Sequence, residues 1–137
     1  MIKRFDHVGL VVKNTEEMVS LLSNLFGFGI SESIMFPEEG FRSTMISKEG
    51  VTIELIEPIG TEEGIIQRFV QKQGWGLHHI SIQVDDIKDE INSLKMKGAR
   101  LVNGEPQVVK GTCNKTAFIH PRSTRGILIE LIQRSQR

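Results

Sequence analysis

The sequence has few of the features that mark secreted, membrane-bound or nucleic-acid-binding proteins. It contains one cysteine, Cys113, which excludes an intramolecular disulfide framework. Its 17 basic and 17 acidic residues cancel, so no excess of basic residues is available to bind nucleic acid or an anionic membrane. The N-terminal stretch lacks a secretory apolar region, and no apolar run reaches membrane length. We therefore expect a cytoplasmic protein whose partner is a small molecule or another protein.

The sequence does contain a glutamate in the middle of each of two apolar segments. Glu54 lies in "GVTIELIE", residues 50–57, and Glu130 occupies the corresponding place in "GILIELIQ", residues 126–133. Desolvating an unpaired carboxylate is costly, so each glutamate needs exposure, a cationic partner or a metal ion. The segments are therefore either strands with one solvent-exposed face or parts of a metal site.

The two glutamate segments belong to a longer internal repeat. "DHVGLVVKNTEEMVSLL" from Asp6 aligns with "HHISIQVDDIKDEINSL" from His78, and the alignment pairs His7 with His79. Both copies alternate between faces like half-buried strands and then reach a helix N-cap followed by apolar residues at helical spacing. Each copy therefore begins with a strand and a helix.

The rest of each copy predicts further strands, so that each is a βαβββ module. Between the copies, apolar residues at helical spacing predict a linking helix. Two similar modules usually pack as one pseudo-symmetric domain, which here would be residues 1–137. We place module 1 at about 4–60, the linking helix at about 62–74 and module 2 at about 77–134. The strands expected after each first helix lie near 29–36, 41–48 and 51–58, and near 100–103 (weak), 115–120 and 126–134.

The alternation of side chains along a strand separates the two adjacent histidines. His79 shares a face with Ser81, whereas His78 lies on the apolar face. The repeat thus sets two imidazoles, of His7 and His79, and two carboxylates at corresponding places in the two modules. Such a donor set suits a divalent first-row metal and leaves two octahedral positions for substrate or water.

These segments resemble the vicinal-oxygen-chelate (glyoxalase-like) superfamily, and within it the methylmalonyl-CoA epimerases, over the whole chain. The resemblance is carried by "DHVGLVV", "PEEG", "IELIEPIG", "GLHHISIQVDDI" and "HPRSTRGILIEL". It implies an α+β fold in which the two modules form one curved eight-stranded mixed sheet with helices on its outer face. It also implies four site residues, the metal ligands His7, Glu54, His79 and Glu130.

The resemblance further implies an isomerase that interconverts the R and S forms of methylmalonyl-CoA at C2 through a metal-stabilised enolate. The metal implied first is cobalt, with zinc, manganese and nickel as alternatives. The partner would be an acyl-CoA, and the family resemblance suggests a homodimer.

Inversion at C2 requires an acid–base pair, because a proton leaves one face and another arrives on the opposite face. Some epimerases carry a glutamate three residues after the glycine of the Pro-Glu-x-Gly turn, where this chain has Ser43. Serine is no base of comparable strength without an activator. We therefore predict Glu130 as the catalytic base by family resemblance, and Glu54 as the second candidate by the symmetry of the repeat.

Three other functions are compatible with parts of this pattern. A glyoxalase I-type lactoylglutathione lyase would use the same four ligands, but the "HPRSTRG" segment resembles epimerases more closely. A non-catalytic small-molecule binding protein of the same fold would often lack the ligands that are present here. A dioxygenase would leave the fourth ligand unexplained, because its facial triad needs two histidines and one carboxylate.

Overall fold

The computed structural model describes residues 1–60 and 63–135, which fall into two compact units. One unit comprises residues 7–78, and the other comprises Met1–Asp6 with the chain from His79 onward. Strands β1 (Ile2–Val11) and β5 (Gly76–Val84) each contribute residues to both units. The single domain over residues 1–137 and its module boundaries stay a prediction, and residue 62 of the predicted linking helix lies outside the described residues.

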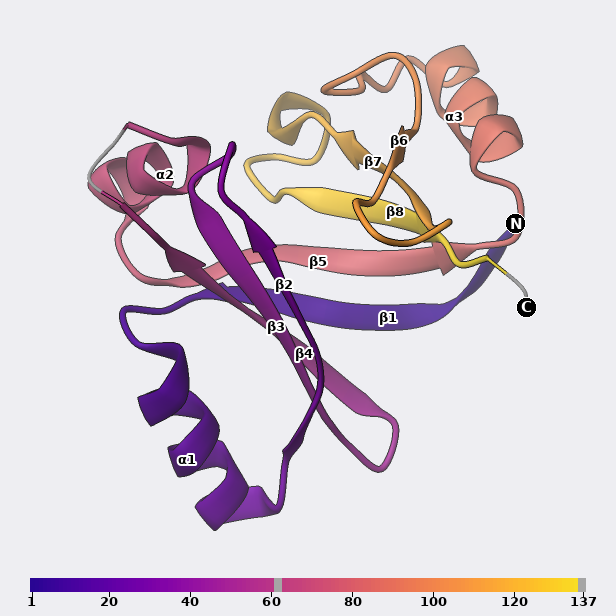
Figure 1. The fold of residues 1–137 in the computed structure, drawn as a ribbon. Coiled ribbons are helices and arrows are strands. Elements are labelled where there is room, and N and C mark those ends of the chain that lie inside the picture. Colours follow the sequence, from indigo (N-terminus) through magenta and orange to yellow (C-terminus); the bar gives the residue numbers. More distant parts are fainter. Residues whose placement is uncertain (61–62, 136–137) are drawn as a thin grey trace. The chain divides into compact units, whose positions relative to one another are not determined.

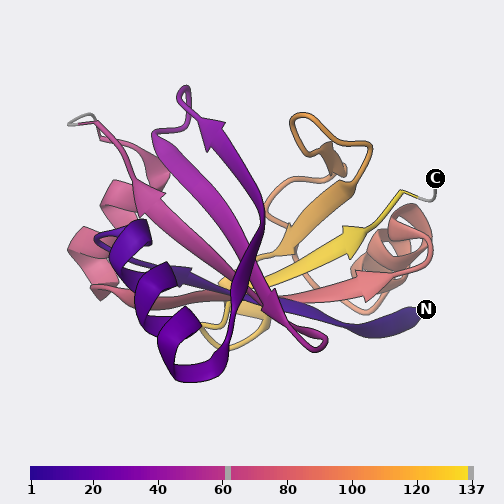
Figure 2. The same ribbon diagram turned by 60° about the horizontal axis from the view of Figure 1, so that its bottom comes forward.

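The unit of residues 7–78 is built around a sheet with the strand order β2-β3-β4-β1. Strands β2, β3 and β4 form an antiparallel meander, visible in Figure 2, and β1 runs parallel to β4. The strands expected near 29–36, 41–48 and 51–58 are confirmed, as is a helix within the predicted linking segment. The elements after β1 are α1 (Thr15–Phe26), β2 (Gly29–Phe36), β3 (Phe41–Lys48), β4 (Val51–Pro58) and α2 (Ile65–Gln73).

The first helix, α1, has a capping residue at each end. The side chain of Asn14 accepts a hydrogen bond from the backbone N–H of Glu17 at 2.9 Å and so satisfies a donor that the first turn leaves unpaired. The helix ends at Gly27, whose φ of 81° is a left-handed conformation that glycine adopts without a Cβ penalty. Local chemistry alone therefore sets both ends of α1.

Asn14→Ala is expected to lower the free energy of unfolding by about 1 kcal/mol, because the Glu17 N–H loses its acceptor. Asn24→Ala, a matched change at an exposed position inside the same helix, is expected to stay within roughly 0.5 kcal/mol of wild type. Urea unfolding followed by circular dichroism measures both. Equal destabilisation by the two variants would contradict the capping role.

The second unit has the corresponding order β5-β8-β7-β6, with β5 parallel to β8 and the other pairs antiparallel. Helix α3 follows β5 and packs on β7 and β8 (Figure 1). The predicted strands near 115–120 and 126–134 are confirmed in slightly shorter form. After β5 come α3 (Ile87–Met96), β6 (Gln107–Val108), β7 (Lys115–Ile119), the 3₁₀ turn η1 (Pro121–Ser123) and β8 (Ile129–Gln133).

The expectation of a strand near 100–103 is wrong. Only Leu101 of that segment forms a β-bridge, to Ile119 at the end of β7. The chain then turns away from β7 and returns at β6, which pairs with the beginning of that strand. The edge of β7 is thus bordered by two separate short pieces of chain, and β6 takes the place of the predicted strand.

Each unit buries one face of its sheet under a helix. In the unit of residues 7–78, Leu55 and Ile46 pack against apolar residues of α1. In the other unit, Ile87 and Ile91 of α3 pack against Leu131 of β8. Because side chains alternate along a strand, the neighbours of these core residues point to the opposite faces. The glutamates that precede Leu55 and Leu131 therefore lie on the faces away from α1 and α3.

The predicted fold class is confirmed as α+β, since the described part of the chain forms eight strands in a mixed sheet and three α-helices. Among residues 1–60 and 63–135, none of these helices combines the length and the apolar composition that a membrane crossing requires.

Candidate metal and acid–base site

The first histidine–glutamate pair lies on the parallel strands β1 and β4. Gly9 is the register partner of Glu54, and His7 precedes Gly9 by two residues, so that His7 and Glu54 share one face as diagonal neighbours. The Nε2 atom of His7 lies 3.5 Å from Oε1 of Glu54, and the His7 residue is 1% exposed. Sequence repeat and register together thus place an imidazole beside a carboxylate in this unit.

The second pair repeats this arrangement on the parallel strands β5 and β8. Ser81 is the register partner of Glu130, and His79 precedes Ser81 by two residues. The Nε2 atom of His79 lies 3.9 Å from Oε1 of Glu130, and both residues are buried, with exposures of 3% and 8%. Each unit therefore carries one imidazole nitrogen and one carboxylate oxygen in the same geometric relation.

The surroundings of the two glutamates differ. The hydroxyl of Ser43 on β3 donates a hydrogen bond to Oε2 of Glu54 at 2.6 Å. Across from Glu130 lies Phe118 of β7, and the ring of Phe118 stands edge-on to that of His79, with 5.8 Å between ring centroids. Glu54 thus accepts a hydrogen bond from a neighbouring hydroxyl, whereas Glu130 faces an aromatic side chain.

Sequence reasoning missed the contacts of Ser43 and Phe118, although the sequence holds a partial signal for each. Alternation along β3 and β7 indicates which face each residue occupies. Alternation does not predict the register between neighbouring strands, and this register decides whether the residue reaches a glutamate.

Ser81 carries a buried hydroxyl beside Glu130. The residue is 0% exposed, and among the described residues its Oγ has no hydrogen-bond partner. Leaving a buried hydroxyl unpaired costs on the order of 1–3 kcal/mol, so such a group usually marks a place for a polar ligand or water. The face that carries His79 and Glu130 therefore has a donor available for a bound polar molecule.

An ion pair holds the beginning of β1 in its unit. The guanidinium of Arg134 donates two hydrogen bonds to the carboxylate of Asp6, at 2.8 and 2.7 Å. Such a bidentate pair is among the stronger side-chain interactions, and the side chain of Asp6 is 6% exposed. Asp6 directly precedes His7, so this pair fixes the strand close to the candidate ligand.

Arg42, next to Ser43 in the sequence, forms its ion pairs away from Glu54. The guanidinium of Arg42 hydrogen-bonds Glu16 at 2.9 Å and Glu57 at 3.3 Å, on the other face of β3. The hydrogen bond from Arg42 lowers the pKa of Glu16 below its ordinary value, and the same contact raises the pKa of Arg42. Arg42 therefore serves to join α1 to the sheet, on the face opposite to Glu54.

The remaining histidines of the predicted segments have local contacts. His78 is half-buried and packs edge-on against Phe69 of α2, with 4.6 Å between ring centroids. His120 caps η1, because its Nδ1 accepts a hydrogen bond from the backbone N–H of Arg122 at 3.1 Å. These contacts give both histidines a local structural role.

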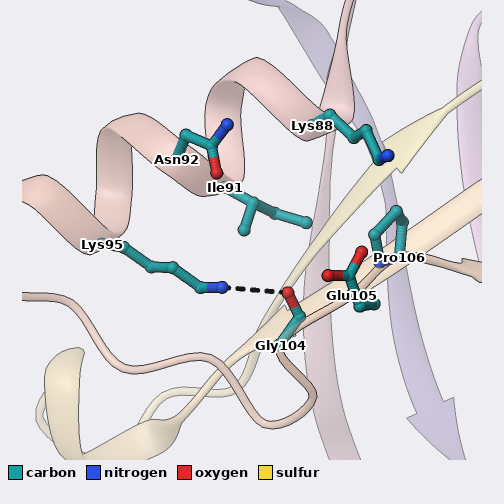
Figure 3. A pocket seen from close by; sticks show the side chains of 7 residues that line it. All are labelled: Lys88, Ile91, Asn92, Lys95, Gly104, Glu105 and Pro106. Carbon is teal, nitrogen blue, oxygen red and sulfur yellow. Dashed lines mark hydrogen bonds between the residues drawn. The ribbon is translucent and has the colours of Figure 1, made fainter.

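Two cavities lie away from the predicted ligands. One, of about 170 Å³, is lined by α3 and the loop before β6, where Lys95 Nζ donates to the carbonyl oxygen of Gly104 at 3.0 Å (Figure 3). The other, of about 460 Å³, lies between α1, the end of β1 and Trp75. At its edge, the Nζ atom of Lys13 lies 5.6 Å from the centroid of the Trp75 ring. Neither cavity is lined by the four predicted metal ligands.

Comparison with known proteins places these features in a family. The sequence model described as Glyoxalase/Bleomycin resistance protein/Dioxygenase superfamily matches residues 6–118. The ethylmalonyl-CoA/methylmalonyl-CoA epimerase of Cereibacter sphaeroides is 34% identical over 136 residues, which are 97% of this chain and 99% of that protein. The mitochondrial methylmalonyl-CoA epimerase of Dictyostelium discoideum is 33% identical over 132 residues, which are 95% of this chain and 78% of that protein.

A solved structure supports the same comparison. A variant of the Streptomyces coelicolor methylmalonyl-CoA epimerase, in complex with 2-nitronate-propionyl-CoA, matches this chain with a TM-score of 0.87 at 25% identity. The match covers 99% of this chain and 100% of that one.

Proposed function

We propose a reaction for this chain, which belongs to the glyoxalase/bleomycin resistance/dioxygenase superfamily and is a methylmalonyl-CoA epimerase-like isomerase. The proposed reaction interconverts the R and S epimers of methylmalonyl-CoA at C2. The observation that carries the proposal is the repeated histidine–glutamate pair on the parallel strands of the two units. The Streptomyces relative with a bound acyl-CoA analogue supports a CoA thioester as the substrate class.

Three residues of the two pairs form a group that could hold a divalent metal ion. His7, Glu54 and His79 each offer one atom of a kind that binds such ions, and Glu130 offers a carboxylate in the same position of its own pair. Two imidazoles with two carboxylates form an intermediate ligand set that cobalt, manganese, nickel and zinc accept. We propose that all four residues hold one ion, with cobalt as the first candidate.

When bound, a divalent ion supplies Lewis-acid polarisation of the thioester carbonyl and so makes the hydrogen at C2 more acidic. Glu130 then removes that proton: the C–H bond breaks, its electron pair enters the enolate, and the proton moves to the carboxylate. Return of a proton to the opposite face of C2 completes the inversion. Glu54 is the second candidate for the acid–base pair because it holds the equivalent place in the repeat.

The surroundings of Glu130 suit the role of a base. The residue is 8% exposed and lies across from Phe118, so its carboxylate is largely removed from water, which would otherwise compete for the proton. The hydroxyl of Ser81, buried beside Glu130, is available to donate a hydrogen bond to an oxygen of the substrate. We propose that Ser81 helps to orient the malonyl group for this reason.

Solvent-exchange measurements test the proposed reaction directly. In deuterium oxide with added Co²⁺, the protein is expected to exchange the C2 proton of methylmalonyl-CoA, measured by NMR or mass spectrometry. The methylglyoxal–glutathione adduct is the comparison substrate, and the protein is expected to leave it unchanged. Conversion of the adduct without exchange at C2 would identify a lyase instead, and binding without turnover of either compound would identify a non-catalytic binding protein.

The homodimer and the cytoplasmic location that the sequence suggested stay predictions. The site requires neither of them, because each unit of one chain supplies one histidine and one glutamate.

A further inference from the structure

We propose that Ser43 is a positioning residue, which holds the carboxylate of Glu54 in the orientation needed to bind the metal ion. The inference rests on the proposed function, since that function takes Glu54 as a ligand. Ser43 stands where some epimerases carry a glutamate.

The hydrogen bond between Ser43 and Glu54 is short and buried. The Ser43 hydroxyl lies 2.6 Å from Oε2 of Glu54, within the range of charge-assisted O–H···O⁻ bonds, and the serine is 7% exposed. Oε1 of the same carboxylate lies 3.5 Å from Nε2 of His7. Ser43 thus binds one oxygen of Glu54, and the other oxygen is turned toward the neighbouring candidate ligand.

The register of β3 and β4 explains why Ser43 makes this contact. Met45 is the register partner of Glu54, and Ser43 and Ser47 flank Met45 on the same face of β3. Both serines are therefore diagonal neighbours of Glu54, at a separation that a long side chain can span. The glutamate side chain reaches Ser43, whereas Ser47 lies beside Thr52 near the turn between the strands.

This geometry has a consequence for metal binding. A flexible carboxylate must lose rotational freedom when it coordinates an ion, and a hydrogen bond that fixes it beforehand reduces this loss. Outer partners of metal ligands typically change metal affinity by roughly 10–100-fold when they are removed. Ser43 fixes the carboxylate from the side of Oε2 and thereby favours coordination through Oε1.

Metal affinity of the purified protein, measured by competition with a chelator for Co²⁺, tests the role without reference to activity. Ser43→Ala is expected to weaken Co²⁺ binding by roughly 10-fold or more and to change the visible absorption spectrum of the bound ion. Ser47→Ala, the matched change on the same face of β3, is expected to bind like wild type. Ser43→Thr keeps the hydroxyl and is expected to retain most of the affinity.

A double-mutant cycle shows whether Ser43 acts through Glu54. Glu54→Ala is expected to weaken Co²⁺ binding, and adding Ser43→Ala to Glu54→Ala is expected to cause no further loss, because the serine then has no ligand to orient. Wild-type affinity in Ser43→Ala, or full additivity in the double variant, overturns the positioning role. Wild-type affinity in Glu54→Ala instead overturns the metal site of the proposed function, so the two failures are distinguishable.

Discussion

Glu130→Gln is expected to slow epimerisation of methylmalonyl-CoA by on the order of a hundredfold or more, while the protein keeps much of its divalent ion. The two proposed roles of Glu130 make different chemical demands. A glutamine retains a carbonyl oxygen that can coordinate a divalent ion, but an amide does not accept a proton from carbon at a useful rate. The measurements are the C2 exchange rate at saturating substrate and the metal content of the same sample.

Glu54→Gln is the matched control, because it makes the same change at the corresponding place of the other unit. We expect a milder loss of turnover, because the amide oxygen can take the place of Oε1 while the amide NH₂ group donates a hydrogen bond to the Ser43 hydroxyl. A reversed pattern, with exchange abolished by Glu54→Gln and near wild type in Glu130→Gln, would exchange the two assignments. If both variants keep metal and wild-type turnover, the base is another residue.

His79→Ala is expected to weaken binding of a divalent ion by more than about a hundredfold, a larger loss than removal of an outer partner causes. His78→Ala is expected to bind the ion like wild type. Strand alternation places the two adjacent imidazoles on opposite faces, and His79 is the one beside Glu130. Titration with Co²⁺ in the presence of a competing chelator gives both affinities.

His78→Ala also has an expected effect on thermal stability. His78 packs edge-on against Phe69, and aromatic pairs of this kind contribute on the order of 0.5–1.5 kcal/mol. His78→Ala is therefore expected to lower the melting temperature of the metal-free protein while leaving metal binding intact. An equal loss of metal affinity in both variants would show that the assignment of strand faces is wrong.

Much of the fold was predictable because it depends on local chemistry. Asn14 and Asp86 cap the helices that follow them, each accepting a hydrogen bond from the residue three positions later. The period of two along β5 likewise predicted that His79 and His78 face opposite ways. The prediction of a strand near 100–103 was wrong, because pairing with β7 ends at the Leu101 bridge and resumes only at β6.

The sequence by itself determined the two βαβββ repeats and the four residues that form two histidine–glutamate pairs, since both follow from periodicity and from the repeat. The tertiary structure alone decided which side chains surround those pairs. Ser43 reaches Glu54, Phe118 lies across from Glu130, and Arg134 binds Asp6, each through strands that are distant in sequence. The physical reason is that alternation fixes the face of a side chain, whereas its neighbours depend on which strands pair and at what register.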